Sequence, residues 1–157
     1  MKINTLTIST LIISIVSVFT LGACSSDDGD TTKPVITLTS PAEGANLQIG
    51  NEKGIHIEMD LEDNEMLASY KIDIHSNFDN HNHSKAEGET IAFTFSKSWN
   101  VTGKNAYIHQ HEIIVPLNTT PGKYHLMVYC VDAAGNESYV ARNIVLSTEG
   151  GDDDNHE

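Results

Sequence analysis

Hydrophobic and polar residues alternate along several short segments in the middle of the chain. The clearest cases are IHIEMDLED (55–63), MLASYKIDIHS (66–76) and GKYHLMVYCVD (122–132). Successive side chains of a β-strand point to opposite faces, so a period of two is typical of a strand with one buried face. These segments therefore predict strands that pack one side on a core.

Four further runs have the same β-rich character, and turn-forming residues separate the runs. They are PVITLTSP (34–41), TIAFTFSKSW (90–99), AYIHQHEIIVPL (106–117) and YVARNIVLS (139–147). EGAN and GNEKG, between the first two strands of the chain, predict turns. No segment shows helical periodicity of useful length. About seven alternating strands in roughly 110 residues predict an all-β fold, an antiparallel β-sandwich.

The two ends of the chain differ from this pattern. Residues 1–23 contain one Lys and an apolar run, which predicts a secretory signal peptide. The run ends in Leu-Gly-Ala-Cys, which resembles a bacterial lipobox; the resemblance implies cleavage before Cys24 and lipidation of Cys24. We expect residues 24–33 to be a lipidated acidic tether, 34–147 the folded domain and 148–157 an acidic disordered tail.

The tether sequence CSSDDGD resembles the Ser/Asp-rich tags of surface-exported lipoproteins. That resemblance implies an outer-membrane lipoprotein on the cell surface; the alternative is a plain spacer facing the periplasm. A membrane partner through the lipid anchor is expected, together with a transporter or another surface partner.

Net charge narrows the possible partners. Without residues 1–23 the chain keeps 8 basic and 22 acidic residues, a formal charge of −14. Such a surface argues against nucleic acid and attracts cations. Cys130 is the one thiol left after lipidation, so no internal disulfide is expected, and its apolar neighbours predict a buried position.

The segment TTPGKYHLMVYCVDAAGNES resembles the penultimate hairpin of bacterial immunoglobulin-like and fibronectin-like modules, and PVITLTSPAEGANL is similar to their first strand. The resemblance implies an immunoglobulin-like sandwich in which Tyr124 anchors a corner. The turn chemistry agrees, because Gly135 permits a positive φ and Asp132 and Asn136 can cap the turn.

The arrangement as a whole resembles an uncharacterised family of His-rich, immunoglobulin-like lipoproteins, a domain of unknown function. The shared features are the lipobox, IHSNFDNHNH, an HxH before IIVP, and GKYH ahead of DAAGN. The resemblance covers nearly the whole mature chain and implies no established activity.

Histidines provide the main candidate chemistry, because neutral imidazole is the commonest protein metal ligand. In the immunoglobulin-like arrangement the strands carrying His75 and His125 are antiparallel neighbours. We therefore expect these two rings on one outer face at one end of the sheet. His81 and His83 follow on the next loop and could complete a four-histidine metal site.

His109 and His111 lie on a strand of the other sheet. They could join the same site, form a second site with His56, or stack on Tyr107 or Trp99. By itself His56 is expected to be an ordinary solvent-facing strand residue, as is His156 in the tail. A carboxylate ligand could come from Asp73, Asp79 or Glu112, and Asp73 is preferred because it shares a face with His75.

Three functions fit these features. The first is capture of a transition metal, Zn²⁺ or alternatively Cu²⁺ or Ni²⁺, by a lipid-anchored envelope protein. The alternative is an adhesion, glycan-contact or protein-interaction module with pH-responsive histidines. A zinc hydrolase is disfavoured because the sequence contains no nucleophile elbow and no P-loop. We expect the protein not to be an enzyme.

Overall fold

The structure is a computed structural model that describes residues 29–77 and 90–151. The predicted signal peptide, Cys24, His81, His83, Asp79 and His156 lie outside the described residues. The described part contains eight strands and no helix, which confirms the all-β class. The strands are β1 (Val35–Ser40), β2 (Asn46–Gln48), β3 (Ile55–Glu62), β4 (Leu67–Ser76), β5 (Phe95–Asn100), β6 (Asn105–Ile113), β7 (Gly122–Asp132) and β8 (Glu137–Ser147).

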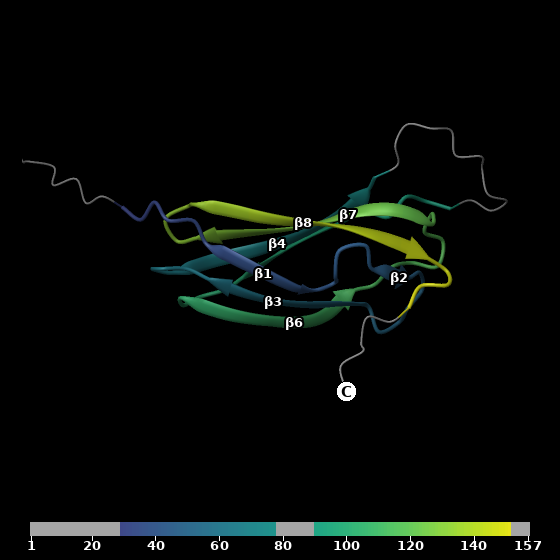
Figure 1. The fold of residues 1–157 in the computed structure, drawn as a ribbon, viewed down its shortest axis with the longest axis horizontal. Coiled ribbons are helices and arrows are strands. Elements are labelled where there is room, and N and C mark those ends of the chain that lie inside the picture. The colour runs from purple at the N-terminus through teal and green to yellow at the C-terminus, as the bar shows by residue number, and fades with distance from the viewer. Residues whose placement is uncertain (1–28, 78–89, 152–157) are drawn as a thin grey trace, which may run out of the picture.

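The strands form two sheets (Figure 1). One has three strands in the order β1-β3-β6, and its pairs are antiparallel. The other has five strands in the order β2-β8-β7-β4-β5; only its β2–β8 pair is parallel. No helix in the described residues is long and apolar enough to cross a membrane.

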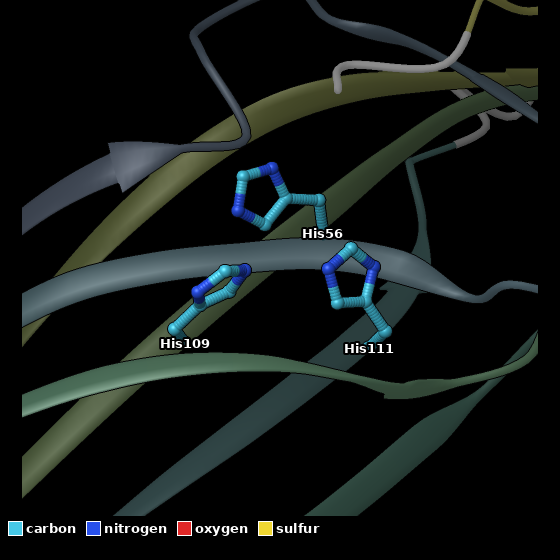
Figure 2. A group of neighbouring side chains, drawn as sticks. All are labelled: His56, His109 and His111. Carbon is cyan, nitrogen blue, oxygen red and sulfur yellow. The ribbon is translucent and has the colours of Figure 1, made fainter. Parts of the chain in front are cut away.

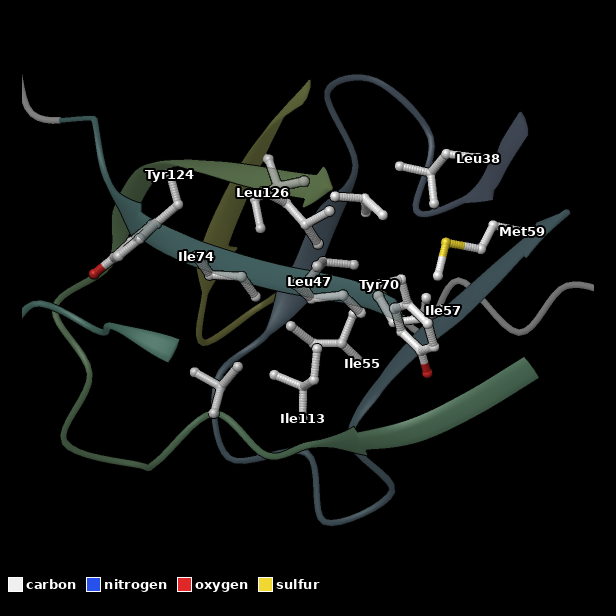
Figure 3. Packing of buried hydrophobic residues seen from close by; sticks show 14 of the residues in the cluster. Leu38, Leu47, Ile55, Ile57, Met59, Tyr70, Ile74, Ile113, Tyr124 and Leu126 are labelled. Atoms are coloured by element: carbon white, nitrogen blue, oxygen red, sulfur yellow. The ribbon is translucent and has the colours of Figure 1, made fainter. Parts of the chain in front are cut away.

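The alternating faces predicted from sequence converge on one core (Figure 3). The inward residues of β3, β4 and β7 are almost completely buried, as period-two patterning requires. Gln110 of β6 donates a hydrogen bond to the Tyr70 hydroxyl of β4 at 2.9 Å and so links the two sheets. The fully buried side chains include Ile57, Met59, Leu61, Ile72, Ile74, Tyr124, Leu126, Val128, Cys130 and Ile144.

Two predicted anchors are confirmed near β7. The Tyr124 hydroxyl is buried; it donates to the Thr120 carbonyl at 2.7 Å and accepts from the Phe93 amide at 3.2 Å. In the turn after β7, Gly135 has a φ of 93° and the Asn136 amide donates to Asp132 Oδ1 at 2.7 Å. These contacts fix both ends of the central strand of the larger sheet.

The structure differs from the prediction at two places. β2 is a short strand between the two predicted turns, where no strand was predicted; Asn46–Gln48 forms it by running alongside the last residues of β8. The strand predicted over 90–99 begins only at Phe95. Before it, Ile91 exchanges backbone hydrogen bonds with Asn118 and Thr120 instead of pairing with β4, and it stays 64% exposed. The described chain therefore has eight strands rather than about seven.

Candidate metal centre

Three histidines meet on the outer side of the three-stranded sheet (Figure 2). His56 comes from β3, and His109 and His111 come from β6. One ring nitrogen from each can be chosen so that all three lie within 4.8 Å of one another. The ring centroids are 4.9 to 5.5 Å apart, and the rings of His56 and His111 are stacked with an interplanar angle of 6°. We call this group the histidine triad.

Strand geometry explains how the triad forms. His109 and His111 are two residues apart on β6 and so share a face, while Ala106 and Ile108 pack toward the core. β3 is the antiparallel neighbour of β6, with Glu58 opposite His109. The register shifts between Ile55 and Ile57, an irregularity that falls at His56.

Gly54 allows β3 to begin close to β6. Its φ is +86°, a conformation that favours glycine. A Cβ at this position would lie 2.0 Å from the carbonyl oxygen of His111. The close backbone approach that positions His56 beside His111 is therefore available only to a residue without a side chain.

The three histidines of the triad differ in solvent exposure. His56 is only 7% exposed, His111 is half-buried and His109 is exposed. The expectation that His56 would be an ordinary solvent-facing residue is therefore wrong. The rings of His109 and His111 on the neighbouring strand cover its ring. Predicting this contact requires knowing which strands pair.

One carboxylate lies beside the triad, and it is not one of those predicted. Glu58 Oε2 is 3.9 Å from His56 Nε2, and Glu58 Oε1 accepts a hydrogen bond from the Tyr107 hydroxyl at 2.9 Å. That bond to a carboxylate raises the pKa of Tyr107. Glu112 instead accepts hydrogen bonds from Lys97 and Trp99, which lower the pKa of its carboxyl.

The other predicted histidine pair is also adjacent. His75 of β4 and His125 of β7 are direct cross-strand partners, and their ring centroids are 5.5 Å apart at an angle of 88°. Asp73 Oδ1 lies 2.8 Å from His75 Nδ1, so the preferred carboxylate does accompany this pair. The expected juxtaposition is confirmed, whereas a four-histidine site with His81 and His83 stays a prediction.

The two histidine groups belong to different sheets, so the described structure separates His109 and His111 from His75 and His125. Of the alternatives for His109 and His111, association with His56 is observed, and His109 also lies edge-on to Tyr107 with the ring centroids 6.4 Å apart. The HxH spacing of residues 109–111 is visible in the sequence. The sequence named His56 as one possible partner, and the β3–β6 pairing is what selects it.

The triad offers the chemistry of a late transition metal site. Three imidazole nitrogens match the three protein ligands of an open zinc site, whose fourth position takes water or another group. Nitrogens around a tetrahedral Zn²⁺ at about 2.0–2.1 Å are about 3.4 Å apart, so the triad would have to close by no more than about 1.4 Å. Glu58 is placed to orient a ring or to approach the fourth position.

Comparison with known proteins identifies the family of this chain and no activity. No curated protein matches the chain significantly. A family model described as a domain of unknown function, DUF4625, matches residues 22–147. Because this match covers most of the sequence, the chain belongs to the DUF4625 family.

Proposed function

We propose that this protein binds a late transition metal ion, Zn²⁺ foremost and Cu²⁺ or Ni²⁺ as alternatives, at the histidine triad. The observation that carries the proposal is the convergence of three ring nitrogens from two paired strands within 4.8 Å. Two of the donors are held by one strand and the third by its neighbour, so the backbone ladder of the sheet preorganises the site.

The donor set favours this class of metal over others. Imidazole suits zinc, copper and nickel, whereas Ca²⁺ and Mg²⁺ prefer oxygen ligands. The formal charge of −13 raises the local concentration of cations around the domain. Glu58 adds a negative charge close to the rings and would partly neutralise the bound ion.

A simpler explanation of the triad is that the rings merely pack on one another. The rings of His56 and His111 are stacked, and the other two pairs are tilted at similar centroid distances. The two explanations differ in what they require of the nitrogens. Packing needs only face-to-face contact, while metal binding needs donor atoms that converge, and the triad has both.

We propose in addition that the domain is an immunoglobulin-like sandwich held at the cell envelope by a lipid on Cys24. Two sheets that share a core, and the buried hydroxyl of Tyr124 bonded to Thr120, support the fold assignment. The lipobox-like sequence that ends at Cys24 supports the anchor. In this setting the domain would hold an envelope metal for storage or for transfer to a transporter.

Isothermal titration of the metal-stripped protein with Zn²⁺ tests the proposal. We expect one strong site in the wild type, and a loss of at least about tenfold in affinity in His109→Gln and in His111→Gln, because each substitution removes one donor. The matched control is the double variant His75→Gln, His125→Gln, which alters one exposed and one half-buried imidazole on the other sheet.

Three results would contradict the proposal. Absence of zinc binding by the folded wild type would leave the triad as ring packing. Loss of binding in the control alone would move the metal site to the His75–His125 pair. If acid changes the state of the protein and Zn²⁺ does not bind, the pH-responsive interaction module is favoured.

A further inference from the structure

Three carboxylates from distant parts of the chain meet at the far end of β3. Asp30 precedes β1, Asp63 follows β3 and Asp132 ends β7. One oxygen from each can be chosen so that all three lie within 4.8 Å of one another. We call this group the carboxylate cluster.

Each carboxylate is held by the polypeptide around it. Asp63 Oδ1 accepts the amides of Glu65 and Met66 at 2.9 and 2.7 Å, which shapes the turn between β3 and β4. Both Asp132 oxygens accept hydrogen bonds from Asn136, each at 2.7 Å.

Asp30 is fixed in the same manner. Its Oδ1 accepts the Thr32 amide at 2.9 Å and the Asn64 side-chain amide at 3.1 Å. Asn136 also donates its side-chain amide to the Asp30 carbonyl at 2.9 Å. The segment before β1 is therefore joined to both of the loops that supply the other two carboxylates.

The cluster contains oxygens whose bonding is incomplete. Asp63 is 9% exposed and Asp132 is 2% exposed. Asp63 Oδ2 and Asp30 Oδ2 are buried, and neither has a hydrogen-bond partner among residues 29–77 and 90–151. Oδ1 of Asp63 already accepts the two turn amides, so Oδ2 is the oxygen of Asp63 whose hydrogen-bonding capacity is unused.

No basic side chain of the described chain forms an ion pair with any of the three carboxylates. Lys104, whose backbone carbonyl accepts the Asp63 amide at 2.7 Å, directs its ammonium group to the Asn64 carbonyl. Like charges in close contact and buried acceptors without donors both cost free energy. Burial by itself would raise the pKa of Asp132, but the hydrogen bonds from Asn136 and neighbouring amides hold it below its usual value.

We propose that Asp30, Asp63 and Asp132 form a Ca²⁺ site that fastens the segment preceding β1 to the end of the sandwich. A hard divalent cation would satisfy the buried Oδ2 atoms and remove the repulsion between the carboxylates.

The donors discriminate between metals. They are all oxygens, which selects Ca²⁺ or Mg²⁺ and disfavours Zn²⁺. Three oxygens bound to one Ca²⁺ at about 2.3–2.6 Å can be mutually up to about 4.5 Å apart, so a cluster whose oxygens lie within 4.8 Å of one another would have to close by no more than a few tenths of an ångström. Mg²⁺ keeps most of its waters and uses one or two carboxylates, so three converging carboxylates favour Ca²⁺.

The site would be independent of the histidine triad. His56 and Asp63 are seven residues apart along β3, roughly 23 Å at ~3.3 Å per residue. The role of the site also differs, because it connects the envelope-anchored end of the chain to the fold. Ca²⁺ would stiffen that connection and set the orientation of the domain relative to its anchor.

Titration of the chelator-treated full-length protein with CaCl₂ tests this proposal, with calorimetry for stoichiometry and hydrogen exchange for the anchoring segment. We expect one Ca²⁺ per chain, a melting temperature raised by several degrees, and slower exchange of the Thr31 and Thr32 amides. Asp63→Asn and Asp30→Asn should each weaken binding at least about tenfold. Glu62→Gln, an exposed acid next to the cluster, should bind like the wild type.

Two results would overturn the proposal. If the folded wild type takes up no Ca²⁺ at millimolar concentration, a shared proton and not a cation stabilises the cluster. If Glu62→Gln weakens binding as much as Asp63→Asn, the effect is general attraction to an acidic surface. Asp132 also anchors the β7–β8 turn, so its substitution can affect folding as well as binding. The test therefore relies on Asp63→Asn and Asp30→Asn.

Discussion

Cys130 illustrates how burial controls the chemistry of a single side chain. Its sulfur lies in the core with no exposed area, and burial raises the pKa of the thiol from its ordinary value of 9.0 to about 11. A thiol of this kind is neutral at physiological pH and is a structural residue, because the thiolate is the reactive form.

We therefore predict that Cys130 is alkylated only when the protein unfolds. Iodoacetamide at pH 8, followed by mass spectrometry of the peptide that contains Cys130, should show modification in denaturant and none in buffer. Rapid modification of the native protein would contradict the burial of this residue.

The raised pKa of Cys130 also sets a pH dependence of stability. Between pH 9 and pH 11 the unfolded chain releases the thiol proton and the folded chain keeps it. The stabilising contribution is complete below pH 9 and is lost as the pH rises toward 11. Urea unfolding should therefore show a steeper loss of stability over this range in the wild type than in Cys130→Ala; equal slopes would exclude this contribution.

The buried hydroxyl of Tyr124 makes two hydrogen bonds to backbone groups. We predict that Tyr124→Phe lowers the free energy of unfolding by about 1–3 kcal/mol, because the Thr120 carbonyl and the Phe93 amide lose their partner. Tyr139→Phe on the exposed face of β8 is the control and should change stability little. Urea denaturation measures both, and similar effects of the two substitutions would contradict the anchoring role.

At the scale of elements, the start of β3 links the backbone to the histidine triad. We predict that Gly54→Ala pushes β3 away from β6, lowers stability and weakens zinc binding, because its Cβ meets the His111 carbonyl. Gly44→Ala shares the strain of a positive φ, 77°, but its Cβ contacts nothing within 4 Å. Calorimetric titration of both variants with zinc separates the effect of the clash with His111 from that of the strain at a positive φ. Equal zinc affinities would show that the close approach does not position His56.

Seven of the eight strands were predicted from the sequence. β4 and β7 follow period two most closely, and their neighbour relation placed His75 beside His125. β2 could not be predicted, since its three residues are a strand only through their pairing with β8.

The candidate site was harder to predict than the fold. His109 and His111 were identified from their spacing, but His56 lies more than fifty residues earlier in the chain. Its membership depends on a register shift that falls between Ile55 and Ile57, which alternation does not reveal. The carboxylate cluster likewise combines three loops whose proximity arises only in the folded chain.

At the scale of the whole molecule, nitrogen and oxygen donors are gathered at opposite ends of β3. If both proposals hold, Zn²⁺ and Ca²⁺ should stabilise the protein independently, since sites more than about 10 Å apart usually contribute additively. We predict that the increases in unfolding free energy with each ion sum when both are present. Urea titrations without added ions, with each ion alone and with both ions measure this sum. Strong competition between the ions would show that they share one site.

The central claim is that His56, His109 and His111 hold one metal ion together. The most direct measurement is nuclear magnetic resonance of the imidazole nitrogens in ¹⁵N-labelled protein during titration with Zn²⁺. We predict that ring nitrogens of these three residues shift together and saturate at one equivalent, while those of His75 and His125 stay unchanged. Shifts confined to His75 and His125, or no shift at His56 when the others respond, would contradict the claim.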